Sequence, residues 1–333
     1  MKDILVKGCL FGVVFWATCA ILKEKGRNGE FDMAIMYLAK INLTEGIFDV
    51  YDNKLNLDDV KQTIYDELDE KKTFSTSSSY KYRDSYGNTS RMPQLSKYSV
   101  KELTKSDNGV ITGKLVRTFN KPTERINEYG KVLQSSHEET VSIYFYLDSK
   151  QEMIAFSERQ SFGYNQFMTA FAFILSKNTK KYKFEIFLQK DKGILEDKIR
   201  ALKSIRNIKA TLIPPNSNDK DLEEFRNSLQ YMQDCRDTNA NKFKMEMLTT
   251  DDRNSLKIDS KYMQDIFTAV SKGYGEVNTT GINQNGKRQT ISSNQDAAVT
   301  RIIDDNLTEQ EYNRESKSFI YEWIGKIHKR ANK

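Results

Sequence analysis

Strand-type and helix-type segments follow one another along this chain without strict alternation, and this order constrains the fold more than any motif does. Met33–Leu43 is a short apolar run typical of a buried strand, whereas residues 166–177 carry apolar side chains on one helical face. Asn285 and Gly286 lie between two further strand-type runs, which indicates a hairpin. A parallel α/β fold requires regular alternation, so the chain is predicted to be α+β, with mixed sheets and packed helices.

Composition predicts two subdomains after an apolar N-terminal segment. The chain has 333 residues and is 38% hydrophobic, which is enough for two domains with a core each. We expect the apolar segment at 1–32, an N-terminal α+β domain at 33–176 and a basic C-terminal α+β domain at 177–333. Residues 73–96 are rich in Ser, Tyr, Asn, Gly and Arg, and this composition predicts a mobile insertion in the N-terminal domain.

Residues 4–22 are nearly all apolar, and three interpretations of them stay open. About 20 residues suffice to span a bilayer, so the run is a candidate membrane anchor, although basic residues on both sides leave its orientation undecided. It is also compatible with a buried strand or helix. A third interpretation is that translation starts at Met33, because codons for Gly29 and Glu30 can resemble a ribosome-binding site. We expect a cytoplasmic protein, with anchoring through 4–22 as the alternative.

Cysteine and histidine are too sparse for the common disulfide and metal chemistries. Three Cys and two His give no disulfide framework and no zinc-ligand pattern, which points to a reducing compartment. The chain also lacks a phosphate-binding glycine loop, a dinucleotide-binding glycine motif and the short motifs of zinc proteases and serine hydrolases. The acidic pairs at 58–59, 251–252 and 304–305 stand at helix starts and turns. We expect no catalytic residue, no metal site and no cofactor.

Positive charge is concentrated in residues 177–209, which we call the basic tract. It holds nine lysines and two arginines against four acids, a net charge of 11 − 4 = +7, compared with +6 for the whole chain. Tyr182, Phe184 and Phe187 are interleaved with these cations, a combination typical of surfaces that bind polyanions. The other interpretation is a solvated lysine-rich face that keeps the protein soluble. The candidate nucleic-acid-binding residues are Lys177, Lys180, Lys181, Lys183, Lys190, Lys192, Lys198, Arg200, Lys203, Arg206 and Lys209.

Several segments together resemble a family of uncharacterised bacterial defence-associated proteins. They are an opening strand and acidic helix, residues 111–117, the pair 143–146 and 154–156, and a late hairpin that begins Gly273-Tyr274-Gly275. The order is also similar, more distantly, to the phage-exclusion protein RexA and the Kiwa component KwaB. The resemblance covers about 33–293 and implies a DNA-binding sensor without sequence preference that works with a membrane effector.

The basic tract predicts nucleic-acid binding and the resemblance implies a sensor in abortive infection, with DNA favoured over RNA and a homo-oligomeric state expected. Lysine and arginine would neutralise phosphates, which gives affinity without base reading. Two alternatives stay open. One is a metal-dependent nuclease with dispersed carboxylates, and the other is a membrane-anchored interaction protein whose basic face meets anionic lipid.

Overall fold

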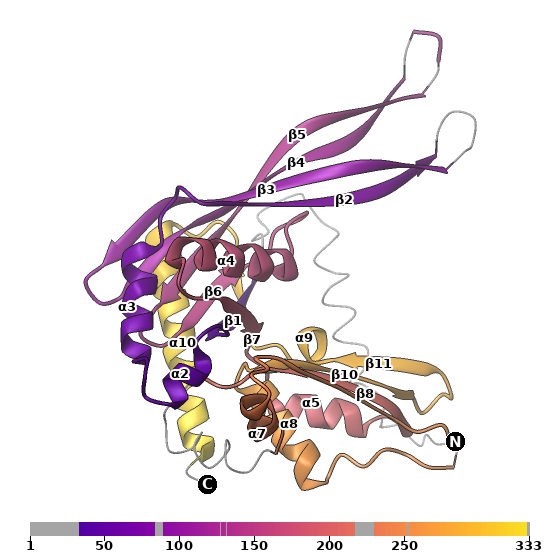
Figure 1. Cartoon of the computed structure of the whole chain (residues 1–333). Coiled ribbons are helices and arrows are strands. Elements are labelled where there is room, and N and C mark those ends of the chain that lie inside the picture. Colours follow the sequence, from indigo (N-terminus) through magenta and orange to yellow (C-terminus); the bar gives the residue numbers. More distant parts are fainter. Residues whose placement is uncertain are drawn as a thin grey trace, which may run out of the picture.

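The computed structural model describes residues 33–83, 89–126, 128–130, 132–216, 230–251 and 253–331. Two sheets with helices packed against them make up these ranges, so the predicted α+β class is confirmed (Figure 1). The apolar segment 1–32, with its candidate anchor at 4–22, lies outside the described residues. Within the described ranges, no helix has the length and apolar character needed to cross a membrane.

The first sheet has the strand order β12-β1-β6-β5-β4-β3-β2, and β7 pairs with β1 beside this path. Every pairing within it is antiparallel. Its strands are β1 (Met33–Leu43), β2 (Thr73–Arg83), β3 (Thr89–Ser106), β4 (Val110–Ile126), β5 (Val132–Asp148), β6 (Met153–Ser157), β7 (Phe184–Leu188) and β12 (Thr300–Asp304).

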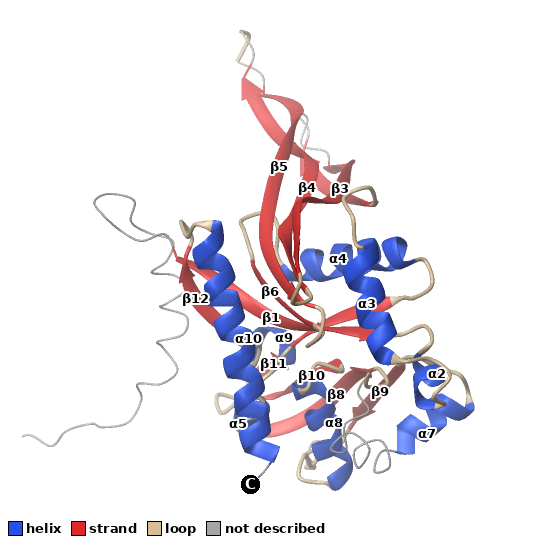
Figure 2. Cartoon of the chain, turned by 90° about the vertical axis from the view of Figure 1, so that its left-hand side faces the viewer, coloured by secondary structure: helices blue, strands red, loops and turns tan. Residues whose placement is uncertain are grey.

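Strand β1 is buried on both faces, which explains why its sequence is mostly apolar rather than alternating, with Lys40 and Asn42 as the polar exceptions. Tyr37, Ala39 and Ile41 contribute to the core that contains the residues of helices α3 (Leu57–Glu67) and α4 (Tyr164–Thr179). Met36 and Leu38 contribute to a separate core with helix α10 (Glu309–Ala331). Figure 2 shows α10 on one side of this sheet and α3 and α4 on the other. The opening strand predicted at Met33–Leu43 and the helix predicted within 166–177 are both confirmed.

Local signals fix the ends of two helices. Asn56 precedes α3, and its Oδ1 accepts a hydrogen bond from the backbone N–H of Asp58 at 2.9 Å, as expected for an N-cap. Helix α8 (Lys261–Ser271) is followed by Gly273, whose φ of +81° matches the left-handed residue that commonly ends a helix. A Cβ at Gly273 would lie 2.5 Å from Gln189 Nε2, so the buried Gln189 amide would have to shift to admit a larger residue.

The second sheet has the order β11-β10-β8-β9 and packs against helices of the second half of the chain. Its strands are β8 (Ser204–Leu212), β9 (Phe243–Leu248), β10 (Gly275–Ile282) and β11 (Arg288–Ser292). The predicted hairpin at Asn285 and Gly286 joins β10 to β11 and is confirmed. The remaining helices are α2 (Ile47–Tyr51), α5 (Lys192–Arg200), α7 (Gln230–Asp237) and α9 (Ser293–Asp296).

The expected division at residue 176 does not coincide with the division between the two sheets. Strand β7, strand β12 and helix α10 come from the predicted C-terminal domain, yet β7 and β12 pair with β1 in the first sheet, and α10 packs on it. The second sheet is built from residues 204–292 alone. The chain therefore leaves the first sheet after β7, forms the second sheet, and returns.

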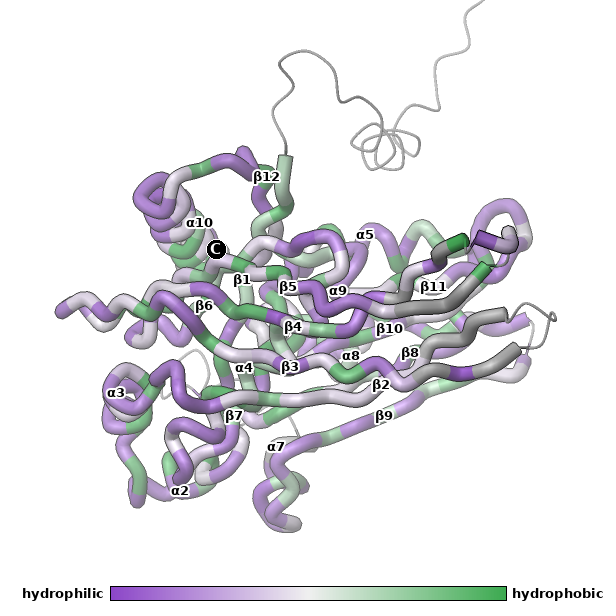
Figure 3. Tube along the Cα trace, turned by 90° about the horizontal axis from the view of Figure 1, so that it is seen from above, coloured by the Kyte–Doolittle hydropathy of each residue, from purple (hydrophilic) through white to green (hydrophobic). Residues whose placement is uncertain are grey.

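The predicted mobile insertion at 73–96 forms two paired strands in the residues that the structure describes there, 73–83 and 89–96, and its mobility stays a prediction. Strands β2 and β3 pair over eleven positions, from Thr73 with Ser99 to Arg83 with Thr89. The segment lacks the apolar alternation of a core strand because much of it does not face a core; β2 is white and purple over most of its traced length in Figure 3. Ser, Thr and Tyr are nevertheless compatible with a β-ladder, and backbone hydrogen bonds between the strands stabilise this segment in place of side-chain burial.

The first sheet divides into two separate ribbons toward its distal end (Figure 1). Pairing of β3 with β4 ends at Ser96 and Phe119, whereas β2 stays paired with β3, and β4 with β5, for several more residues. Continuing the β3–β4 register by three residues on each strand would place Pro93 opposite Pro122. Proline has no N–H to donate, so it interrupts a ladder.

Backbone orientation shows that both prolines face the gap. The side-chain amide of Gln94 donates to the carbonyl of Asn120 at 3.1 Å, so the backbone of Asn120 is directed toward β3. Alternate residues of a strand face the same neighbour, so Pro122 and the facing Pro93 occupy positions whose N–H groups would otherwise join the two strands. We conclude that the proline pair ends the ladder and holds the two ribbons apart.

We predict that Pro93→Thr combined with Pro122→Thr extends the β3–β4 ladder, because the variant regains two backbone donors at facing positions. Hydrogen exchange should then slow for amides within 89–95 and 120–126. Pro93→Thr alone serves as the control, since Pro122 still blocks its side of the ladder. Exchange in the double variant as fast as in the wild type would contradict the assignment.

Candidate nucleic-acid interface

The eleven candidate residues of the basic tract are spread over elements of both sheets. Lys177 lies in the last turn of α4, and Lys180, Lys181 and Lys183 lie between α4 and β7. Lys190 follows β7. The remaining members belong to the second sheet and its helix, with Lys192, Lys198 and Arg200 on α5, Lys203 before β8, and Arg206 and Lys209 on β8.

Acids from distant parts of the chain neutralise much of this tract. Ion pairs join Lys183 to Glu45 at 2.7 Å, Lys198 to Asp296 at 3.0 Å, Arg200 to Asp259 at 2.5 Å and Lys209 to Glu246 at 3.2 Å. Lys192 lies 3.6 Å from Glu196 within α5. The net charge of +7 counted along the sequence is therefore not the charge of a surface, because four of these five acids lie outside the counted window.

The prediction that Lys190 contacts nucleic acid is wrong, because its side chain is fully buried. Its Nζ donates to the carbonyl of Gly275 at 2.6 Å and lies 5.6 Å from the centre of the Phe187 ring. Burial lowers the pKa of Lys190 from 10.5 to about 7, although the nearby carboxylate of Glu276 acts in the opposite direction. The strand pattern around Lys190 gave no sign of this, since lysine in the interior is rare.

Arg206 also has an internal role. Its guanidinium donates to the backbone carbonyls of Asp251 at 2.6 Å and Asn254 at 3.0 Å. These bonds attach the loop after β9 to β8. Charge reversal at Arg206 would therefore disturb the fold as well as the charge of the basic tract.

Four lysines lie at the C-terminal end of α4 and the start of β2, three of them exposed and one partly exposed. We call Lys72, Lys177, Lys180 and Lys181 the α4-end lysines. Lys177 Nζ donates to the carbonyl of Thr73 at 3.4 Å and lies 4.7 Å from the centre of the Phe173 ring. Across the described ranges, the ion pairs in this region join Lys71 to Asp69, Lys101 to Glu70 and Lys183 to Glu45, and none involves the four lysines. Cations are also favoured at a helix C-terminus by the helix dipole, so three of them suit their position in the fold.

The predicted acidic pairs lie in local turns and contacts. Asp58 and Asp59 occupy the first turn of α3. Asp251 accepts from the backbone N–H of Arg253 at 2.9 Å, and Asp305 forms an ion pair with Arg159 at 2.5 Å. Asp252 lies outside the described residues. Within the described ranges, no three His, Cys, Asp or Glu side chains gather as a metal-ligand set.

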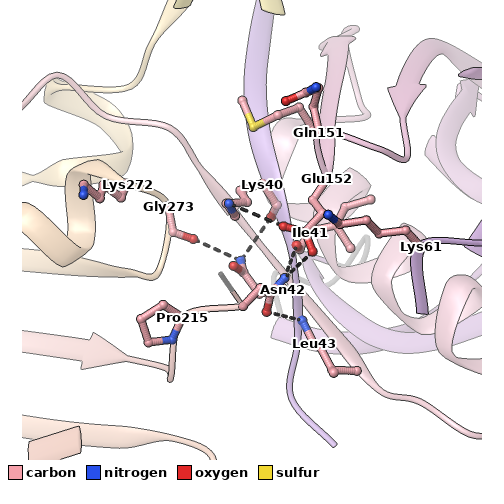
Figure 4. A network of polar contacts seen from close by, with 12 residues as sticks. Lys40, Ile41, Asn42, Leu43, Lys61, Gln151, Glu152, Pro215, Lys272 and Gly273 are labelled. Carbon is pink, nitrogen blue, oxygen red and sulfur yellow. Dashed lines mark hydrogen bonds and ion pairs between the residues drawn. The ribbon is translucent and has the colours of Figure 1, made fainter. Parts of the chain in front are cut away.

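A buried polar junction, which the sequence gave no reason to expect, joins the two sheets beneath this region (Figure 4). Asn42 of β1 donates through Nδ2 to the carbonyl of Gly273 at 3.0 Å. Asn216, just after β8, accepts from the N–H of Leu43 at 2.8 Å and donates to the carbonyl of Ile41 at 2.9 Å and to Glu152 Oε1 at 3.1 Å. Both asparagines are almost fully buried.

Lys40 completes the charge balance of this junction. Its Nζ lies 3.5 Å from Glu152 Oε2 and 5.0 Å from the centre of the Tyr274 ring. Burial by itself would lower the pKa of Lys40, but Tyr274 and Glu152 outweigh that effect and raise the pKa above its ordinary value. The lysine therefore stays charged, and the junction holds an ion pair rather than an isolated charge.

Comparison with known families shows which family the chain belongs to. Residues 91–319, more than half of the sequence, match the family described as a domain of unknown function, DUF4747. The chain belongs to the DUF4747 family. No curated protein matches the sequence. The DUF4747 match begins in β3 and ends within α10, so it omits β1, although β6, β7 and β12 of the matched region all pair with that strand.

Lys190→Met should make the stability of the protein less dependent on pH. The pKa of Lys190 is about 7 in the folded protein and near 10.5 when unfolded, so the unfolded chain binds more protons between these values. The free-energy cost of burying the charged amine of Lys190 is thus largest below about pH 7, and it decreases as the pH rises toward 10.5. Between pH 7 and 10, the free energy of unfolding should rise more in the wild type than in the variant, by about 1–4 kcal/mol.

Chemical denaturation at several pH values measures this difference, and Lys203→Met at an exposed position is the control. Equal pH dependence in the wild type and in Lys190→Met would show that the buried amine does not titrate in this range.

Asn216→Ala should weaken the connection between the two sheets. The substitution removes three hydrogen bonds and leaves the buried groups that made them without a partner, which should lower the free energy of unfolding by about 2–4 kcal/mol. Asn306→Ala, at an exposed turn, should change it by less than about 0.5 kcal/mol. If Asn216→Ala lowers the free energy of unfolding no more than Asn306→Ala does, the junction contributes little to stability.

Proposed function

We propose that this DUF4747 protein binds nucleic acid through the phosphate backbone and that the α4-end lysines are the primary contact. The observation that supports the proposal is their grouping without acidic partners in the described structure, whereas most other cations of the basic tract are paired. Lys177, Lys180 and Lys181 are exposed, and Lys72 is partly exposed. A cation that already has an acidic partner must give up that interaction to bind a phosphate, so unpaired lysines bind more favourably.

Contacts of this kind predict affinity without base recognition. Each lysine that neutralises a phosphate releases condensed counterions, and the binding constant then falls with salt concentration. Flexible lysine side chains act as point charges rather than as the rigid donors that distinguish bases.

The biological part of the proposal comes from the resemblance to defence-associated proteins. We propose a cytoplasmic sensor in abortive infection, acting as a homo-oligomer together with a membrane effector. The segment order described above supports this part. The metal-dependent nuclease is the competing function, and it predicts cleavage of DNA or RNA by the purified protein with magnesium or manganese.

We expect the combined variant Lys177→Glu, Lys180→Glu and Lys181→Glu to lose most of its affinity for duplex DNA. Removing three phosphate contacts should make the slope of log affinity against log salt shallower by about 2.7, at about 0.9 per contact. Fluorescence anisotropy over a salt series measures both quantities. The control variant Lys257→Glu, Lys287→Glu and Arg288→Glu carries the same change in net charge at exposed positions elsewhere.

Binding by the folded triple variant as tight as that of the control would remove the α4-end lysines from the proposal. Metal-dependent cleavage that is lost on substitution of an acidic residue would replace it with the nuclease.

A further inference from the structure

The two distal ribbons of the first sheet differ in charge. We call residues 77–83 of β2 and 89–95 of β3 the basic arm; it contains Lys81, Arg83 and Arg91 and no acid. The corresponding part of β4 and β5, residues 120–126 and 132–138, contains two cations and two acids. That second ribbon instead exposes apolar side chains near its tip, namely Ile126, Tyr129 and Val132. The two ribbons are therefore suited to different partners.

The basic arm continues directly from the α4-end lysines. Strand β2 begins at Thr73, whose carbonyl accepts the hydrogen bond from Lys177. Two residues further along β2, Ser75 lies opposite the exposed Lys97 of β3 in the ladder. Lys81 lies opposite Arg91 in the same register. Cationic residues thus recur from the end of α4 to the distal part of the ribbon, along one pair of strands. A polyanion aligned with β2 would meet cationic residues at both ends of the ribbon, with the uncharged residues 76–80 and 92–96 between them.

The split of the sheet gives the basic arm a shape that matters for this partner. A two-stranded β-ribbon fits into the major groove of B-form DNA, which is about 12 Å wide. A four-stranded sheet is too broad, because neighbouring strands are about 4.8 Å apart. Pro93 and Pro122 therefore produce the narrow ribbon by ending the β3–β4 ladder. Seven residues of strand extend about 23 Å, which is close to two-thirds of a helical turn of DNA.

We propose that the basic arm enters the major groove of duplex DNA while the α4-end lysines hold the adjacent phosphates. This inference rests on the proposed nucleic-acid binding and adds the form of the ligand and a second contact surface. It commits to B-form DNA because the major groove of A-form RNA is deep and too narrow for a ribbon. The neutral second ribbon stays outside the groove.

The test compares two variants with the same reduction in net charge. The arm variant carries Lys81→Ser, Arg83→Ser and Arg91→Ser, and its matched control carries Lys257→Ser, Lys287→Ser and Arg288→Ser. With a DNA duplex of about three helical turns, we expect the arm variant to bind at least about tenfold more weakly than the control, with a salt slope shallower by about 2.7. The wild type should bind an RNA duplex of the same sequence more weakly than the DNA duplex.

The outcomes separate this inference from the proposed function. If the wild type binds no nucleic acid, both fail. If the wild type binds DNA, and only substitution of the α4-end lysines weakens it, then the proposed function stands and the groove-binding arm is wrong. Equal affinity for the DNA and RNA duplexes would also overturn the assignment to the major groove.

A second measurement keeps the inference testable if the arm variant does not fold. Hydrogen exchange of the wild-type protein should slow within 77–83 and 89–95 when the DNA duplex is added, because the ribbon becomes enclosed in the groove. The second ribbon, at 120–126 and 132–138, should change less. Unchanged exchange in the basic arm at saturating DNA would reject its insertion.

Discussion

The pairing of β1 with three other strands is the constraint on which the rest of the structure depends. One edge of β1 pairs with β6, and the other pairs with β12 over residues 33–37 and with β7 over residues 39–43. These partners come from the middle and the end of the chain. Because such contacts join residues far apart in sequence, the first sheet cannot be completed until the C-terminal strand and helix are in place, and slow folding is expected of this kind of topology.

The same strand carries the link to the second sheet. Asn42 bonds to Gly273 just after α8, the backbone of Ile41 and Leu43 bonds to Asn216 after β8, and Lys40 pairs with Glu152. Helix α10 joins this arrangement because Trp323 Nε1 donates to Gln189 Oε1, whose amide in turn donates to the carbonyl of Lys272. An apolar contact tolerates small shifts, whereas buried donors and acceptors must meet in one geometry. The junction therefore fixes the relative position of the two sheets more than it adds to net stability.

Elements with local causes could be predicted from the sequence. The apolar run of β1, the cap at Asn56, the glycine at 273 and the turn at Asn285 and Gly286 each act within a few residues, and each has the expected conformation. Residues 73–96 could not be predicted in this way. Their pairing depends on β3 and β4 rather than on a core beneath them, so composition alone resembled that of a loop.

The prediction of the candidate site from sequence was partly wrong for a related reason. Counting charge along residues 177–209 measures the chain, but a ligand meets the surface after folding. Glu45, Asp259 and Glu246 approach the tract only in three dimensions, and Lys190 turns inward to a carbonyl that the sequence places 85 residues away. The grouping of Lys72 with Lys177 is equally non-local, since it requires α4 to end beside the start of β2.

The split of the first sheet connects stability with the proposed binding. A two-stranded ribbon has little apolar surface to bury and is only marginally stable alone, so a proline pair that separates β3 from β4 removes support from both ribbons. Near α4 the sheet rests on packed rings such as Phe74 with Phe173, and the prolines lie beyond that support. Segments that bind partners are often drawn from the least stable parts of a fold, because they must adapt to a second surface. Here the register of the strands brings the end of the β3–β4 ladder and the cationic positions 81 and 91 to the same part of the sheet.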